Sequence, residues 1–179
     1  MTAGRKSTKN NIDWRTPKKY VDAVLDVFGE IDLDPCSNSD SIVPSWDKFI
    51  YPEKDALSEV WNWSRVYCNP PYGKGYNGTT IYDWLKKCSN NEASDVIALI
   101  PVVPNTKHWK EFVFKSNAIC FLSDTRLKFR INGSEDNKGA SMACAMIYWG
   151  EYGKYTNKFI DVFRKYGNIV LNYDKNDIL

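Results

Sequence analysis

Short runs of uninterrupted apolar residues do most to limit the folds open to this chain of 179 residues. Residues 96–100 (VIALI) and 118–122 (AICFL) contain no charged side chain, which is typical of strands buried on both faces of a sheet. Between such runs lie stretches with apolar residues at i, i+3, i+4 and i+7, the spacing of an amphipathic helix. This alternation predicts an α/β fold with a mostly parallel central sheet and helices on both faces.

The first helix is predicted to start with Thr16 as its N-cap and Pro17 in its first turn, and to end at Gly29. Strands are predicted at residues 31–34, 65–68, 141–149 and 168–173. Further helices are predicted after Thr80, after Thr106 and around residues 155–166. Residues 35–64 show no clear periodicity, and their expected core anchors are the apolar residues Trp46, Phe49, Ile50 and Tyr51.

Composition supports one folded domain, expected over residues 12–179 after a polar, basic arm at residues 1–11. The formal net charge of +2 neither requires nor excludes a polyanionic partner. Five cysteines without a C-x-x-C pair, and a single histidine, argue against a metal site and indicate reduced thiols. No apolar run approaches the ~20 residues of a membrane span, so we expect a soluble, intracellular protein with no membrane partner.

Two turns in the sequence are candidates for a ligand site. Ligands of open α/β sheets bind beyond the carboxyl ends of the strands. Asp34-Pro35 follows the first predicted strand, and Asn69-Pro70-Pro71-Tyr72 follows the second. The sequence therefore predicts a site formed by these two turns.

The second turn has the chemistry to activate an aromatic amine. The lone pair of an adenine amine is delocalised into the ring, and two acceptors aimed at its N–H groups would localise it on nitrogen. The Asn69 side-chain oxygen and the Pro70 carbonyl can form that pair, while the two prolines stiffen the turn. Tyr72 offers a ring on which an extruded base can stack. The alternative is a stiff turn that only closes a buried strand.

An ordered series of segments resembles the phage-type DNA N-6-adenine-methyltransferase family over about residues 14–150. The asparagine-proline motif alone is shared with methyltransferases that act on RNA or on protein glutamine, whereas the series is much narrower. It consists of Trp14-Arg15-Thr16-Pro17, Phe28-Gly29, Asp32-Leu33-Asp34-Pro35-Cys36, Asp55-Ala56-Leu57, Asn69-Pro70-Pro71-Tyr72, Trp84, Arg126-Leu127-Lys128-Phe129, and Ser141 with the apolar stretch that ends at Trp149-Gly150.

The resemblance implies a Rossmann-like methyltransferase fold and S-adenosylmethionine as the cofactor. It implies methylation of the exocyclic amine of a flipped adenine in double-stranded DNA. It further implies a phage- or prophage-encoded enzyme of DNA methylation or restriction–modification in the cytoplasm of a bacterial host, and we expect a monomer or weak dimer. The alternatives are an RNA or protein-glutamine methyltransferase, and a non-catalytic nucleic-acid-binding module on the same scaffold.

The resemblance also implies roles for single residues. Asn69, Pro70, Pro71 and Tyr72 match the catalytic motif, and the expected cofactor-binding residues are Trp14, Thr16, Pro17, Asp34, Pro35, Cys36 and Asp55. For three of these a structural role is the alternative: a helix cap for Thr16, a turn cap for Asp34 and an exposed turn for Asp55. One departure is the turn at residues 36–39 (CSNS), where many amino-methyltransferases have glycines.

DNA contacts are expected from two loops. Arg126, Lys128 and Arg130 alternate, which would place three cations on one face of a strand and suits phosphate binding. Lys74 lies in a glycine-rich loop directly after the catalytic motif. For the arginine-rich segment a solvated hairpin is the alternative.

Overall fold

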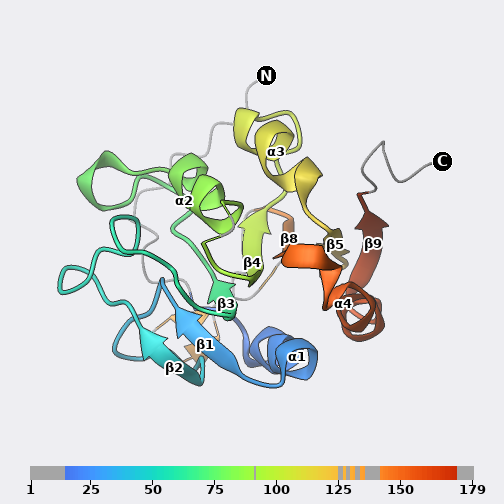
Figure 1. The fold of residues 1–179 in the computed structure, drawn as a ribbon, viewed down its shortest axis with the longest axis horizontal. Helices are drawn as coiled ribbons and strands as arrows, with labels where there is room; N and C mark the ends of the chain where they lie inside the picture. The colour runs from blue at the N-terminus through green and yellow to red at the C-terminus, as the bar shows by residue number, and fades with distance from the viewer. Residues whose placement is uncertain are drawn as a thin grey trace.

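The structure is a computed structural model that describes residues 15–90, 92–124, 127, 130–131, 134–135 and 142–172. A seven-stranded sheet forms its middle layer, and helices cover both faces (Figure 1). The helices are α1 (Lys18–Phe28), α2 (Ile81–Cys88), α3 (Lys107–Glu111) and α4 (Thr156–Phe163), with short 3-10 turns η2 (Tyr76–Gly78), η3 (Val113–Lys115) and η4 (Glu151–Gly153). The strands of the large sheet are β1 (Ile31–Asp34), β2 (Ser45–Lys48), β3 (Arg65–Cys68), β4 (Asp95–Pro101), β5 (Ala118–Leu122), β8 (Cys144–Gly150) and β9 (Gly167–Leu171). A separate hairpin pairs β6 (Arg130–Ile131) with β7 (Ser134–Glu135).

The strand order is β2-β1-β3-β4-β8-β5-β9, and the sheet is mixed. Within the described residues, three neighbouring pairs are parallel, all in the β2-β1-β3-β4 half, and three are antiparallel. The expected mostly parallel sheet is therefore correct only for the first half. The difference arises at β8, which inserts between β4 and β5 and runs antiparallel to both; the described part of its connection from β5 contains a hairpin and no crossover helix.

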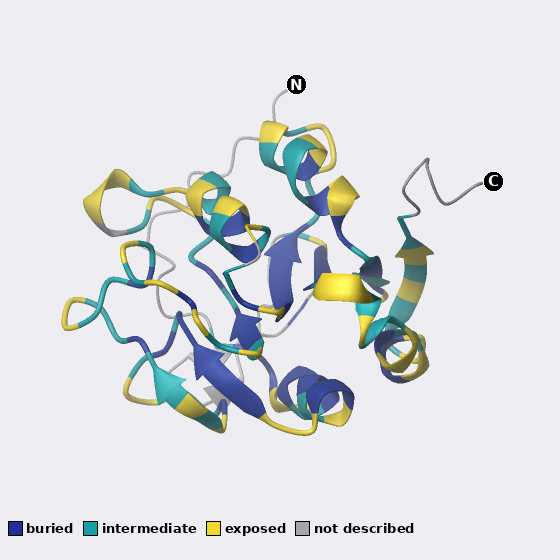
Figure 2. Cartoon of the chain, viewed as in Figure 1, coloured by how far each residue is buried: buried dark blue, intermediate teal, exposed yellow. Residues whose placement is uncertain are grey.

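Burial follows position in the sheet. All residues of β1 and β4 are buried, whereas the edge strands β2 and β9 carry half-exposed and exposed residues (Figure 2). One expected core anchor is wrong for this reason: Trp46 lies on edge strand β2 and is 77% exposed, with its indole N–H donating to Glu30. Phe49 is buried as expected, and Ile50 and Tyr51 are half-buried.

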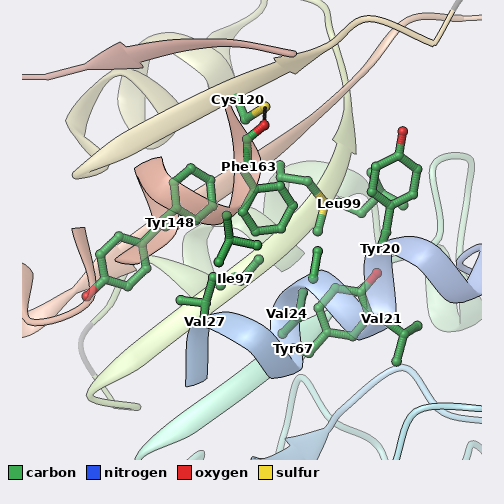
Figure 3. Packing of buried hydrophobic residues seen from close by; sticks show 14 of the residues in the cluster. Tyr20, Val21, Val24, Val27, Tyr67, Ile97, Leu99, Cys120, Tyr148 and Phe163 are labelled. Carbon is green, nitrogen blue, oxygen red and sulfur yellow. Dashed lines mark hydrogen bonds between the residues drawn. The ribbon is translucent and has the colours of Figure 1, made fainter. Parts of the chain in front are cut away.

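Side chains of β4 alternate between two apolar clusters, one on each face of the sheet. Ile97 and Leu99 join the cluster under α1 and α4, where they meet Val24 and Phe163 (Figure 3). Val96, Ala98 and Ile100 face α2 and α3, whose apolar residues include Trp84, Leu85 and Trp109. The two predicted amphipathic stripes at residues 21–28 and 81–88 are the faces by which α1 and α2 pack on the sheet.

Helix α1 begins one residue later than expected. Pro17 is its N-cap, and Thr16 makes no capping hydrogen bond to the helix, so the predicted cap at Thr16 is wrong. Instead the Thr16 hydroxyl lies 2.5 Å from the Tyr67 hydroxyl on β3. Gly29 ends the helix as predicted, with φ at +81°, a conformation that only glycine adopts readily.

The parallel half of the sheet brings the two predicted ligand turns together. β1 and β3 are parallel neighbours, with Leu33 opposite Val66, so the turns that follow Asp34 and Cys68 leave the same edge. In the described ranges, no helix is long and apolar enough to cross a membrane.

Candidate active site

Two hollows lie at the carboxyl edge of the parallel strands. The larger one, here called the main hollow, has a volume of about 110 Å³. The loops after β1, β2 and β3 and helix α2 line it, through residues that include Pro35, Cys36, Ile50, Tyr51, Lys54, Asp55, Leu57, Asn69, Pro71 and Trp84. Its wall combines apolar surface with a few polar groups, which is the usual character of a small-molecule site.

The second, here called the small hollow, has a volume of about 20 Å³ and lies beside the start of α1. Its lining includes Arg15, Thr16, Asp34, Cys36, Asn38, Ser41, Tyr67 and Asn69. Cys36, Asn38 and Asn69 line both hollows, so these three residues form the boundary between them.

The asparagine-proline turn is placed at this boundary. Asn69 directly follows β3 and is half-buried, and Pro70 behind it is buried. The Tyr72 hydroxyl lies 3.1 Å from the Asn69 Oδ1 and 3.1 Å from the Leu99 carbonyl oxygen, both of which it can reach as a donor. Burial raises the pKa of Tyr72 well above its usual value, so the phenol keeps its proton and remains a donor. Tyr72 thus ties the Asn69 side chain to strand β4.

Asp34 lines the small hollow and is itself buried. Its carboxylate accepts hydrogen bonds from the Cys36 amide at 3.2 Å and the Ser41 hydroxyl at 3.0 Å. Burial raises the pKa of Asp34 above its usual value, and the hydrogen bonds from Ser41 and Cys36 oppose this rise. The carboxylate therefore caps the turn after β1 and also lines a hollow, and its role in cofactor binding stays a prediction.

Three thiols lie behind the turn. The Cys36 Sγ is 3.6 Å from the Cys68 Sγ, and all five cysteines are free. Burial raises the pKa of Cys36, Cys68 and Cys88, so these groups are protonated thiols that act as apolar packing. Cys36 takes the position where a glycine-rich turn would allow a ligand to approach the backbone.

The other predicted cofactor residues fall in different places. Thr16 lines the small hollow, whereas Pro17 is buried and lines neither of the two hollows. Asp55 lines the main hollow, and its carboxylate also accepts from the Leu57 amide at 3.1 Å, as in a turn. Trp14 lies outside the described residues.

The structure describes two of the four predicted DNA-contacting residues. Lys74 is exposed two residues after Tyr72 and lines neither hollow. Arg130 lies on β6 opposite Glu135, within the hairpin that was the alternative for this segment. Arg126 and Lys128 lie outside the described residues.

Several residues that line the hollows were not predicted as site residues, and four of them carry polar side chains that matter for a ligand. Arg15, Ser41 and Tyr67 line the small hollow, and Lys54 lines the main one. Tyr67 carries a detectable signal, because it is the one hydroxyl in the four-residue strand stretch at residues 65–68 that precedes the motif. Ser41 and Lys54 lie in the segment without periodicity and gave no signal.

Comparison with known proteins assigns the chain to a family. Within the described residues no group of three or more His, Cys, Asp or Glu side chains could hold a metal ion. No curated protein and no solved structure matches the chain significantly. The family model described as DNA N-6-adenine-methyltransferase (Dam) matches residues 4–168. Because this match covers nearly the whole chain, the protein belongs to the DNA N-6-adenine-methyltransferase (Dam) family.

Proposed function

We propose that this protein transfers a methyl group from S-adenosylmethionine to the exocyclic N6 amine of an adenine flipped out of double-stranded DNA. The observation that carries the proposal is the position of Asn69, at the carboxyl end of β3 and on the boundary between two hollows. A methyl donor that extends along both hollows would pass Asn69, so the Asn69 side chain can contact a target amine brought up beside that donor. Membership in the family supports the same reaction.

Asn69 and Pro70 supply the groups that would make the amine reactive. The Asn69 side-chain oxygen and the Pro70 carbonyl accept from the two N–H groups, so the nitrogen lone pair is freed for attack. The two acceptors lower the reaction barrier most when they are held in place before the reaction, because preorganised dipoles need no rearrangement at the transition state. Pro70 and Pro71 restrict the backbone, and Tyr72 holds Asn69 through its hydroxyl.

The main hollow fits the adenosine part of the cofactor. Ile50, Leu57 and Trp84 provide apolar surface for a purine, and Asp55 and Lys54 provide polar groups at its edge. The buried carboxylate of Asp34 in the neighbouring small hollow fits the cationic end of the same molecule. When bound, S-adenosylmethionine supplies a methyl group on a positively charged sulfur.

The parallel half of the sheet supports a Rossmann-like methyltransferase arrangement. In such folds the ligand binds outside the carboxyl ends of parallel strands. The loops after β1 and β3 line both hollows, and the loop after β2 lines the main hollow. Cys36 replaces a small residue at the turn after β1, so this turn contacts the cofactor through a thiol side chain as well as through the backbone.

DNA binds, in this proposal, through the loops around the motif. Tyr72 stacks on the flipped base, and its anchored hydroxyl fixes the orientation of the ring. Lys74, Arg126, Lys128 and Arg130 contact phosphates. A chain of this length acts as a monomer or weak dimer, and its sequence preference comes from these loops.

The experiment offers labelled S-adenosylmethionine together with DNA, RNA or a mixture of proteins. We expect label in DNA and none in the other two polymers. Label in RNA or protein would show that the substrate is RNA or a protein glutamine, with the same amine-methylation chemistry. An absence of label in all three, combined with no heat of cofactor binding, would reduce the chain to a binding module and overturn the proposal.

A further inference from the structure

Arg15 is a nearly buried cation with unused hydrogen-bond donors. Its side chain is 11% exposed, and its Nη2 pairs with the Asp40 carboxylate at 2.5 Å. The Nε and Nη1 atoms are buried and have no hydrogen-bond partner among the described residues. Buried polar groups of native proteins are almost always paired, so two unpaired nitrogens on one guanidinium call for a ligand.

The place of Arg15 limits what that ligand is. Arg15 lines the small hollow together with Asp34, so a cation and a buried carboxyl group border the same space. A volume of about 20 Å³ admits only a compact polar group, such as the end of a longer molecule. A group that carries both charges, with an anion toward Arg15 and a cation toward Asp34, complements this lining.

The small hollow and the main hollow are neighbours that share lining residues. Cys36, Asn38 and Asn69 belong to both, so a molecule seated in the main hollow can extend one end past Asn69 into the small one. An α-amino acid end has an ammonium and a carboxylate on one carbon. That is the chemical group whose charges match Asp34 and Arg15.

We infer that Arg15 binds the carboxylate of the amino-acid end of the cofactor and makes the site selective for donors that carry this carboxylate. The inference rests on the proposed function, because it takes the main hollow to hold the adenosine part. A guanidinium suits this task because its planar N–H groups match the two oxygens of a carboxylate. Asp40 contributes as a positioning residue, since it holds the third nitrogen of the same group.

The test compares two ligands that differ in the amino-acid end. S-Adenosylhomocysteine carries the carboxylate, and 5′-methylthioadenosine lacks the amino-acid end altogether. In titration calorimetry, Arg15→Gln should lower the affinity for S-adenosylhomocysteine by roughly ten- to hundredfold, the usual effect of losing a charged hydrogen-bonding partner. Its effect on 5′-methylthioadenosine should stay below about twofold, which also shows that the variant is folded.

Two further variants sharpen the result. Arg15→Lys keeps the charge but not the planar donors, so its loss should be intermediate. Lys18→Gln removes an exposed cation three residues away that pairs with Asp22, and it should change neither affinity. An equal loss for both ligands, or no loss for either, would overturn the role of Arg15.

The other anion available to such an enzyme is a DNA phosphate. If Arg15→Gln lowered DNA affinity and flattened its salt dependence while S-adenosylhomocysteine bound normally, Arg15 would be a phosphate contact and the inference would be wrong. A wild-type protein that binds neither adenosine ligand would instead remove the proposed function itself. The two failures are therefore distinguishable.

Discussion

Asn69 depends on its neighbours for a defined orientation. Its Oδ1 lies 3.1 Å from the Tyr72 hydroxyl, and that hydroxyl is also 3.1 Å from the Leu99 carbonyl oxygen on β4. A tyrosine hydroxyl has a single hydrogen, so it donates to one of these acceptors at a time. These contacts hold the Tyr72 ring in one place, and we propose that Tyr72 both positions Asn69 and presents its ring to the base.

The variant Tyr72→Phe separates these two roles, because it removes the hydroxyl and keeps the ring. We expect kcat to fall roughly five- to tenfold, the effect of losing one neutral hydrogen bond, with little change in KM for DNA. Steady-state kinetics on a DNA substrate measure both parameters. A raised KM with an unchanged kcat would show that the hydroxyl serves DNA binding and does not position Asn69.

Asp34 predicts how cofactor affinity varies with pH. Burial raises the pKa of Asp34 in the free protein, and the groups around it are Cys36 and Ser41 from its own loop, Lys48 from β2, and Tyr67 and Cys68 from β3. Arg15 lines the same hollow. A cationic ligand favours the carboxylate and so lowers the pKa of Asp34 in the complex. Affinity should therefore rise with pH through the free-protein pKa of Asp34 and level off above it.

The measurement is titration calorimetry with S-adenosylhomocysteine between about pH 4 and 7, a range in which the ligand's own amino group stays protonated. Calorimetry in two buffers of different ionisation enthalpy should detect a proton released on binding at pH values where the affinity still rises. Asp34→Asn should abolish the slope. A slope that persists in Asp34→Asn would assign the titration to another group.

At the scale of the elements, the site uses only one half of the sheet. β2, β1, β3 and β4 are parallel, and the loops that follow β1, β2 and β3 line the two hollows. β8 and β9 run antiparallel to their partner β5 and complete the core. Edge strand β9 depends on a close approach at Gly167, opposite Leu122. A Cβ at Gly167 would collide with the Phe121 carbonyl group.

Gly167→Ala should therefore destabilise the fold without touching the site. We expect a loss of about 1–3 kcal/mol in the free energy of unfolding, the usual effect of overpacking. Thermal or urea unfolding measures it, and Asn168→Ala at the exposed neighbouring position is the matched control. Stability equal to that of the control would mean that β9 moves away freely. Cofactor affinity per folded molecule should stay normal in both variants.

At the scale of the whole molecule, local patterns predict the elements better than their assembly. The strands β4 and β5 can be predicted because burial on both faces leaves a continuous apolar run. The helices α1 and α2 can be predicted because burial on one face leaves a periodic apolar stripe. β2 leaves none, because an edge strand of four residues with an exposed Trp46 lacks alternation. The antiparallel direction of β8 could not be predicted either, because it depends on pairing with β4 and β5 and not on a local pattern.

The candidate site divides in the same way. Asp34 and Asn69 could be predicted because the carboxyl ends of neighbouring parallel strands meet at one edge, and the structure brings both to the small hollow. Arg15 could not be assigned a partner from sequence, because its unpaired nitrogens become evident only once its neighbours are placed. The hydroxyl of Thr16 contacts the hydroxyl of Tyr67, which lies far away in sequence, and does not cap the helix as expected.

The identity of the methylated nucleoside tests most directly whether Asn69 makes the N6 amine of adenine reactive. DNA treated with the protein and deuterated-methyl S-adenosylmethionine is digested to nucleosides and analysed by mass spectrometry. We expect labelled N6-methyladenine from the wild-type protein. Asn69→Ala should reduce this product roughly 10²- to 10³-fold or more while cofactor binding and stability are kept. Asn62→Ala, at an exposed loop position, should leave the amount of product unchanged. A label on another base, or undiminished N6-methyladenine from Asn69→Ala, would contradict this proposal.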